Sequence, residues 1–355
     1  MGQMILDFVM ESGFAQMDIK QVIVIALACF FLYLAIAKGY EPYLLIPIAT
    51  GMLLANMPGV DLMKAAHDGE KGGLFYYLYQ GVKLGIYPPL IFLCIGAGTD
   101  FGPMIANPKT MLLGGAAQFG VFAAFLGAIA LGFTGPEAAS IGIIGGADGP
   151  TAIQTTGALA PHLLGTIALA AYSYMALVPV IQPPIIKALT TKEERAIKME
   201  QTRPVSQKEK IVFPIVVMII VIGLLPTAAP LVGMLMFGNL LKESGIVPKL
   251  VETAQSSLMY IITILLGLTV GATTTAETLL TTQTLGIIAM GLAAFSVGTA
   301  SGVIGGKIMC KLTGGKVNPM IGAAGVSAVP MASRVVQKVG QEENPSNFLL
   351  MHAMS

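Results

Sequence analysis

The stretch Ile141-Gly-Ile-Ile-Gly-Gly-Ala-Asp-Gly-Pro-Thr151 places one aspartate, Asp148, inside a long apolar and glycine-rich region. Pro150 has no N–H to continue a helix, and the residue before a proline is pushed out of the helical region. We therefore expect a helix arriving from Ile141 to break at Asp148 and to restart after Pro150. A carboxylate at a helix break in so apolar a region indicates a functional site within a membrane.

The composition predicts a helical membrane protein. Of the 355 residues, 55% are hydrophobic and 11% are charged, whereas soluble domains carry about 25% charged residues. Several apolar runs approach or exceed the ~20 residues that a helix needs to cross a bilayer. The formal net charge of +1 gives no reason to expect a nucleic-acid partner. We predict an all-α polytopic protein in a lipid bilayer.

One polar stretch divides the apolar runs into two groups. Residues 187–210 are rich in Lys and Arg, and this excess of basic residues places the stretch in the cytoplasm. The simpler alternative is a solvated connector without a further role. We interpret 1–186 as a first membrane repeat with N-terminal spans, 187–210 as a cytoplasmic basic loop, and 211–355 as a second membrane repeat.

The second group contains a counterpart of the opening stretch. Ile321-Gly-Ala-Ala-Gly-Val-Ser-Ala-Val-Pro330 aligns without a gap on Ile141–Pro150, about half the chain away. The identical pairs are Ile141/Ile321, Gly142/Gly322, Gly145/Gly325 and Pro150/Pro330. Matching Gly- and Pro-interrupted segments in two halves of a chain are typical of a transporter with its binding site at the membrane midplane. We predict two inverted repeats with broken, crossing helices near that midplane.

Crossing helices would bring their polar side chains together. The first segment offers Asp148, Thr151, Gln154 and Thr155, and the second offers Asn318, Ser327, Ser333 and Arg334. Carboxylate, amide, hydroxyl and freed main-chain oxygens suit a small hard cation, so Na+ or a proton is the expected ligand. Tyr172 and Tyr174 follow on the next helix, where a phenol oxygen can ligate a cation or move a proton.

Each of these residues also has a plain structural interpretation, which the residues alone leave open. Asp148 could cap a helix, and Asn318 could be an N-cap followed by Pro319 at the first helical position. Ser327 could bond its own backbone, and Tyr174 could pack at the membrane interface. Arg334 could extend its side chain toward the cytoplasmic surface.

Three longer motifs carry a family resemblance. Gly145–Ile153, Tyr172–Pro184 and Val317–Pro330 resemble the β subunit of the Na+-pumping, biotin-dependent decarboxylases that act on oxaloacetate, methylmalonyl-CoA or glutaconyl-CoA. The resemblance covers nearly the whole chain, from Tyr33 to Met354. It implies an inverted-repeat, scaffold-plus-core fold like that of a transporter, in the prokaryotic cytoplasmic (inner) membrane.

The resemblance also implies an activity and partners. A soluble carboxyltransferase α subunit would move CO2 from the substrate onto biotin of a carrier subunit. The β subunit would then decarboxylate carboxybiotin, consume a proton and export Na+. A small γ/δ membrane anchor and a homotrimer of β subunits are expected, with no nucleic acid. The alternative that the repeat alone permits is a cation-coupled secondary transporter of a small solute.

By motif position, the family assigns roles to six residues. Asp148 and Asn318 would be Na+ ligands, and Gly322 and Ser327 would line the path. Tyr174 with Ser327 would form a second cation or proton-exchange site, and Arg334 would meet the carboxybiotin or its proton. Asp148, Tyr174 and Arg334 are thus the expected catalytic residues. The family continues after Met354 with a last apolar helix, so we expect the second repeat to lack that helix.

Overall fold

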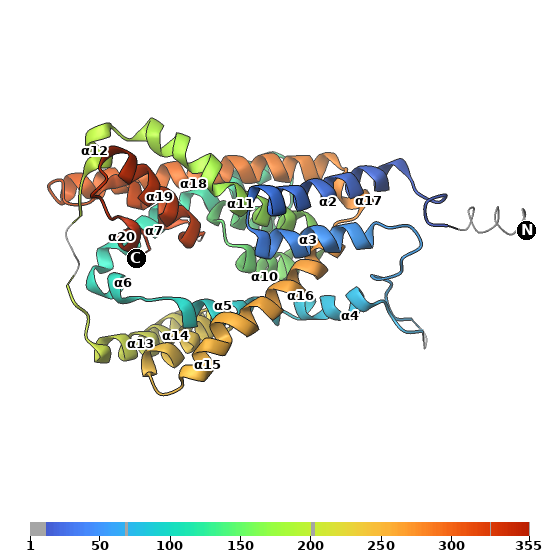
Figure 1. Ribbon diagram of the computed structural model, residues 1–355, viewed down its shortest axis with the longest axis horizontal. Helices are drawn as coiled ribbons and strands as arrows, with labels where there is room; N and C mark the ends of the chain where they lie inside the picture. Colours follow the sequence, from blue (N-terminus) through green and yellow to red (C-terminus); the bar gives the residue numbers. More distant parts are fainter. Residues whose placement is uncertain (1–11, 68–69, 200–202, 327, 355) are drawn as a thin grey trace, which may run out of the picture.

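The structure is a computed structural model that describes residues 12–354 except 68–69, 200–202 and 327 (Figure 1). Within these ranges the regular elements are helices, and the β-type pairing is limited to an isolated bridge between His67 and Glu70. This confirms the predicted all-α class. Labels below follow Figure 1.

The first half runs from the N-terminus to a long bent helix. Its elements are α2 (Ile19–Lys38), α3 (Pro42–Ala55), α4 (Leu74–Lys83), α5 (Tyr87–Gly98), α6 (Gly102–Ala106), η1 (Pro108–Thr110), α7 (Met111–Ala117), α8 (Phe119–Ala130), α9 (Gly135–Gly142), η2 (Ile143–Gly146), α10 (Gly149–Leu159), η3 (Pro161–Leu163) and α11 (Leu164–Leu189).

The second half begins with a short helix in the polar stretch. Its elements are α12 (Lys192–Ala196), α13 (Gln207–Leu224), η4 (Pro226–Ala228), η5 (Ala229–Gly233), α14 (Met234–Ser244), α15 (Pro248–Thr253), η6 (Ala254–Leu258), α16 (Met259–Ala272), α17 (Ala276–Leu279), α18 (Thr282–Leu312), η7 (Pro319–Gly325), α19 (Val329–Glu343) and α20 (Leu350–Ala353).

Among the described residues, four helical segments are long and apolar enough to cross a membrane: Ile19–Lys38, Pro108–Ala130, Pro248–Ala272 and Thr282–Leu312. Two further spans are bent. The α4–α5 pair bends by 66°, and α11 bends by 59° between Tyr174 and Leu177. Pro179 explains the second bend, because it cannot donate the helical hydrogen bond to the carbonyl four residues earlier. These segments confirm the polytopic prediction.

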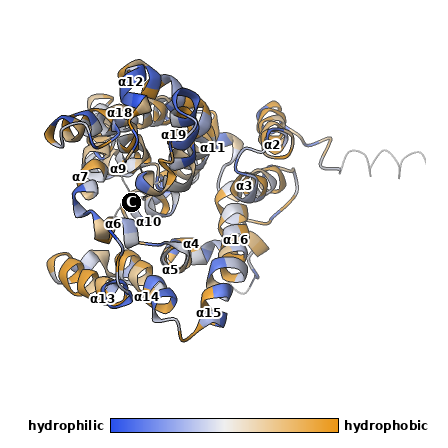
Figure 2. Cartoon of the chain, turned by 60° about the vertical axis from the view of Figure 1, so that its left-hand side comes forward, coloured by the Kyte–Doolittle hydropathy of each residue, from blue (hydrophilic) through white to orange (hydrophobic). Residues whose placement is uncertain are grey.

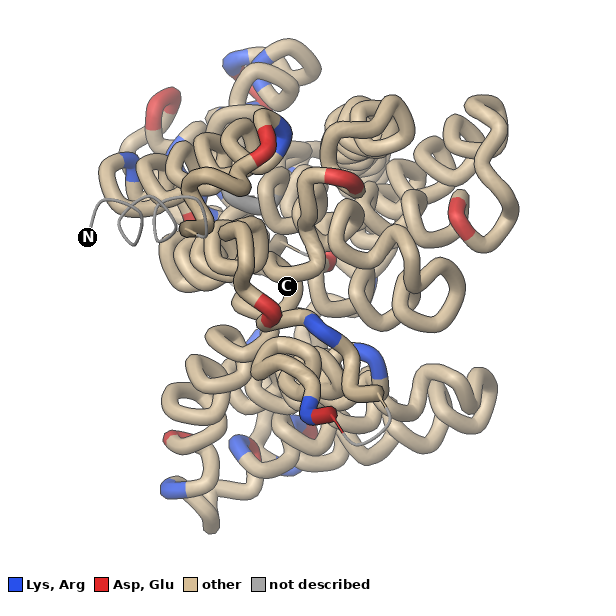
Figure 3. The backbone as a smooth tube through the Cα atoms, turned by 90° about the vertical axis from the view of Figure 1, so that its right-hand side faces the viewer, with Lys and Arg blue, Asp and Glu red and all other residues tan. Residues whose placement is uncertain are grey.

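The packing of α8 shows how such helices sit in lipid. Its large residues Phe119, Phe122 and Leu126 are 63%, 64% and 65% exposed, whereas Gly120, Ala124 and Ala128 are buried. The two sets lie on opposite faces. Small residues let α8 approach its neighbour α18 closely, and the large ones cover the face turned to lipid. Apolar residues colour the outer helices in Figure 2, and Figure 3 shows charged residues mainly at helix ends and turns.

The helices form groups, and one of these groups contains both broken segments. In Figure 2, α7, α9–α12, α18 and α19 lie together, α13–α15 lie with α4 and α5, and α2, α3 and α16 stand at the side. The closest pairings outside the first group are α3 with α16 and α5 with α14. Glycines permit both pairings, since a Cβ added at Gly51 would lie 2.0 Å from the Leu268 oxygen and one at Gly96 would lie 1.9 Å from the Leu235 oxygen.

The expected loop at 187–210 is partly helical, which corrects its predicted extent. The structure continues α11 to Leu189, forms α12 within the stretch and starts α13 at Gln207. Thr191 and Ser206 each begin a helix through a capping box with the glutamate three residues later, at Glu194 and Glu209. These short-range signals determine the helix starts. The division into repeats at this stretch stays a prediction.

Candidate functional site

The chain breaks at Asp148 as the sequence predicts. The short 3₁₀ segment η2 ends at Gly146, Ala147 adopts a left-handed conformation (φ 54°, ψ 38°), and Asp148 is extended (φ −115°, ψ 96°). Ala147 and Glu41 are the two non-glycine residues with positive φ among those described. Such strain persists only where the surroundings enforce it, and it concentrates at functional sites.

Asp148 is the N-cap of α10, and its carboxylate accepts two hydrogen bonds from Thr151. Oδ1 accepts a hydrogen bond from the Thr151 N–H (3.1 Å), and Oδ2 accepts one from the Thr151 hydroxyl (2.7 Å). The helix-cap interpretation is therefore confirmed, and a cap leaves further lone pairs on both oxygens for a cation. The Tyr172 ring packs beside the break, because a Cβ added at Gly149 would lie 2.4 Å from its Cε1 and 3.0 Å from its hydroxyl.

Buried side-chain atoms without a protein hydrogen-bond partner gather on α10 and α11. In the described part of the chain they are Gln154 Oε1, Thr156 Oγ1, Tyr172 Oη, Ser173 Oγ, Gln182 Oε1 and Asn347 Oδ1. All but the last belong to these two helices, which follow Asp148. A buried polar atom without a partner is costly, and each such group in a native structure calls for an explanation. Oxygen atoms that line the course of an ion provide one.

The second broken segment also contains a 3₁₀ turn followed by a helix. Asn318 caps η7, whose 3₁₀ turn ends at Gly325, and α19 starts at Val329. The Asn318 side chain is fully buried and occupied: Oδ1 accepts from the Met320 N–H (3.0 Å), and Nδ2 donates to the carbonyls of Arg195 (3.1 Å) and Ile197 (2.8 Å). The structure thus supports the capping interpretation of Asn318. Ser327 lies outside the described residues.

One face of α18 carries both broken segments. A Cβ added at Gly298 would lie 3.1 Å from the Gly145 oxygen of η2. One added at Gly302 would lie 2.0 Å from the Gly322 oxygen of η7, and the reverse contact at Gly322 is equally close at 1.9 Å. Ala147, next to Asp148, shares a buried cluster with Ala323, Ala324 and Val326. The two breaks therefore lie against the same helix, and the inverted repeat stays a prediction.

Tyr174 and Arg334 lie apart from the Asp148 carboxylate. Residues 172 and 174 point to nearly opposite faces of α11. Tyr172 therefore faces the Asp148 segment, whereas the Tyr174 hydroxyl donates a hydrogen bond to the Ile288 carbonyl on α18. Arg334 is exposed on α19. It faces the α2–α3 turn, where burial raises the pKa of Glu41 and the Arg334 guanidinium opposes that rise.

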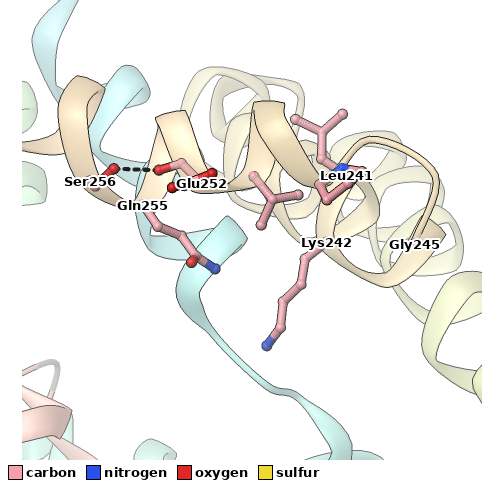
Figure 4. Close-up of a pocket in the computed structure, with 8 residues that line it drawn as sticks. Leu241, Lys242, Gly245, Glu252, Gln255 and Ser256 are labelled. Carbon is pink, nitrogen blue, oxygen red and sulfur yellow. Dashed lines mark hydrogen bonds between the residues drawn. The ribbon is translucent and has the colours of Figure 1, made fainter.

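A pocket of 390 Å³ lies elsewhere, between α14 and η6 (Figure 4). Lys242 and Gln255 extend from its wall toward the end of α5, where Lys242 Nζ donates to the Thr99 carbonyl (2.9 Å) and Gln255 donates to the Ala97 carbonyl. These side chains cap the last carbonyls of α5. Two of the residues that line the pocket thus hold the end of α5.

Gln182 is the site residue that sequence reasoning missed. It lies in α11 between Pro179 and Pro183, and its side chain is fully buried. Its Nε2 donates to the Ala323 carbonyl of η7 (3.0 Å). The available signal was a polar amide within an apolar span, which indicates a function or an interhelical hydrogen bond.

A helical membrane protein with a carboxylate at a broken helix, backed by a second broken segment, has the architecture of an ion-translocating protein. A family model described as the Na+-transporting oxaloacetate decarboxylase beta subunit matches residues 20–355. The chain belongs to this family of β subunits of Na+-transporting decarboxylases. It is accordingly a multi-pass membrane component of a multi-subunit enzyme.

Relatives from different members of the family match along nearly the whole chain. The methylmalonyl-CoA decarboxylase subunit beta of Propionigenium modestum is 58% identical over 371 residues, covering 99% of this chain and 94% of the relative. The glutaconyl-CoA decarboxylase subunit beta of Acidaminococcus fermentans is 56% identical over 346 residues, covering 98% and 91%. The oxaloacetate decarboxylase beta chain of Klebsiella pneumoniae is 48% identical over 398 residues, covering 96% and 92%.

Proposed function

We propose that this subunit decarboxylates carboxybiotin delivered by a biotin carrier subunit and couples the reaction to Na+ export. The observation that carries the proposal is the Asp148 carboxylate at a helix break, where it accepts hydrogen bonds from the Thr151 N–H and hydroxyl. A carboxylate in this position can hold either Na+ or a proton, but the two exclude each other. Such exclusion is the simplest way to link proton uptake to Na+ release.

The chemistry requires one proton for each CO2. The bond between the ureido nitrogen and the carboxylate carbon breaks, its electron pair stays on nitrogen, and the nitrogen takes up a proton as CO2 leaves. A general acid reached from the cytoplasm must supply that proton. We assign the contact with carboxybiotin to Arg334, which is exposed on α19 and faces the α2–α3 turn. Export of one charge against 100 mV requires about 2.3 kcal/mol.

The remaining site residues complete the proposed path. Asp148 holds the cation at the first break, and Asn318, Gly322 and Ser327 provide the second segment. Tyr174 serves as a proton-exchange or second cation position. Because Asn318 is already bonded through both amide atoms, we assign its contribution chiefly to holding the η7 carbonyls in place.

The proposed assembly contains a carboxyltransferase α subunit, the biotin carrier and a small γ/δ membrane anchor, with three copies of this chain. The acyl substrate is selected by the carboxyltransferase, so relatives of different specificity share this membrane subunit. Its substrates are carboxybiotin on the carrier and the transported Na+.

The test uses the whole complex reconstituted in liposomes. Wild type should release CO2 from carboxybiotin only when Na+ is present and should move radioactive Na+ across the membrane. Asp148→Asn should reduce both by about 100-fold or more. Asp100→Asn is the matched control, since this carboxylate pairs with Lys210 (2.8 Å) at a helix end and should leave both activities intact. Na+-dependent turnover that persists in Asp148→Asn would refute the assignment of Asp148 as the cation site. Na+-driven uptake of a solute that carboxybiotin does not affect would favour a secondary transporter.

A further inference from the structure

We infer that Gln182 supplies a second, neutral oxygen ligand for the transported cation at the junction of α11, α18 and η7. This inference rests on the proposed function and adds a residue to it. Gln182 lies past the bend of α11, is 0% exposed, and faces Thr299 of α18 and the Ala323 carbonyl of η7. Three elements that carry or contact the broken segments therefore meet at one amide.

The hydrogen bonds of Gln182 fix the direction of its oxygen. Nε2 donates to the Ala323 carbonyl (3.0 Å) and lies 3.4 Å from the Thr299 hydroxyl oxygen. Reversing the amide would place its oxygen against the Ala323 oxygen, and two acceptors repel each other. Oε1 is thus directed away from the Ala323 carbonyl, and it is buried without a hydrogen-bond donor among the described residues.

The surroundings favour a cation over a protein donor as the partner of this oxygen. Val178 lies one helical turn before Gln182, and Phe295 lies one turn before Thr299, each on the same helix face as the later residue. Both share a buried cluster with Ala147. The amide therefore contacts η7 and adjoins the buried cluster that contains Ala147, the residue before Asp148. Amide and hydroxyl oxygens in an apolar enclosure can serve as ligands for a dehydrated monovalent cation.

This position explains a requirement of transport. A cation that leaves the Asp148 carboxylate needs an alternative site with weaker attraction, so that it can enter and also depart. Neutral oxygens at Gln182 and Thr299 meet that need without adding a second buried charge. The two positions share the support of α18, where Gly298 contacts η2 and Gly302 contacts η7.

The test compares two substitutions with opposite expected effects on the purified full chain. The measurement is the rise in melting temperature when Na+ replaces a large organic cation at constant ionic strength. Gln182→Leu removes the oxygen and should lose most of the Na+-dependent rise. Gln182→Glu keeps the oxygen, adds a charge next to the Ala323 carbonyl and should give a rise larger than wild type. In the complex, the Na+ concentration for half-maximal decarboxylation should increase about tenfold in Gln182→Leu, which corresponds to about 1.4 kcal/mol.

Alternative outcomes separate the two proposals. If both variants show the wild-type Na+ response, Gln182 is only a hydrogen-bonded tie or binds water, and the inference is wrong. If Asp148→Asn retains the full response while Gln182→Leu loses it, the Asp148 assignment fails and the Gln182 inference stands. An absent Na+ response in wild type would overturn both. If Gln182→Leu does not fold, Thr299→Val serves instead, because it removes a neighbouring oxygen. A wild-type Na+ response in both Thr299→Val and Gln182→Glu would refute the inference.

Discussion

Replacing Gly302 with alanine tests the closest contact in the site. The added methyl carbon would lie 2.0 Å from the Gly322 oxygen and 2.8 Å from the Gly322 carbonyl carbon. Ordinary contact begins near 3.4 Å, so η7 and α18 must separate by about 1.4 Å in a closely packed interior. Both neighbours are backbone, and neither can rotate away. We expect a loss of about 1–3 kcal/mol of stability, which is typical of overpacking.

The matched control is Gly286→Ala on the same helix. A Cβ there meets nothing within 4 Å, and alanine favours a helix over glycine by about 1 kcal/mol. The two variants should therefore move the melting temperature of the purified protein in opposite directions. Gly302→Ala should also raise the Na+ concentration needed for decarboxylation, because η7 shifts from the Asp148 segment. Equal stability of the two variants would refute the close approach of η7 to α18.

Two further predictions concern ion pairs made by residues of the polar stretch at 187–210. Glu343→Gln should destabilise the protein by about 3 kcal/mol in denaturant unfolding, because it leaves the buried Arg195 guanidinium, 2.7 Å from Glu343, without its counterion. The control Glu342→Gln breaks an exposed pair with Lys187 and should cost about 0.5 kcal/mol or less. Similar losses in the two variants would contradict the importance of the buried pair. Hydrogen bonding to the Arg203 guanidinium, with help from the Ser206 main chain and hydroxyl, lowers the pKa of Glu209 to about 2. Because this pKa is depressed, the contribution of Glu209 is complete above its ordinary value of 4.5 and is lost as the pH falls through about 2. Carbon NMR titration should show the Glu209 pKa rising toward 4.5 in Arg203→Ala, and an unchanged value would exclude Arg203 as the main cause.

Local chemistry made the break at Asp148 predictable. Proline at position 150 lacks the N–H for a helical hydrogen bond and disfavours a helical conformation at Gly149, so it favours a helix start, and Pro330 likewise stands at the start of α19. The apolar runs likewise predicted the membrane spans, because length and composition suffice for that. The polar composition of residues 187–210 predicted a loop, but the capping boxes at Thr191 and Ser206 start helices there.

Side-chain directions could not be predicted from the sequence alone. Tyr172 and Tyr174 look equivalent in a list of residues, yet the packing of α11 turns Tyr172 to the Asp148 segment and Tyr174 to α18. Gln182 contacts Ala323 across 141 residues of chain, a relation that depends on the bend of α11 and on the position of η7. Asn318 needed the structure to show that its amide holds the carbonyls of Arg195 and Ile197.

The central claim is that Na+ and a proton compete for Asp148. The most direct measurement is the Na+ concentration for half-maximal carboxybiotin decarboxylation, determined across a range of pH in the reconstituted complex. Competition predicts that this concentration rises as the pH falls, approaching tenfold for each pH unit once the proton dominates. It also predicts that Asp148→Asn loses the dependence together with the activity. A half-maximal Na+ concentration that stays constant across the pH range in wild type would contradict the claim.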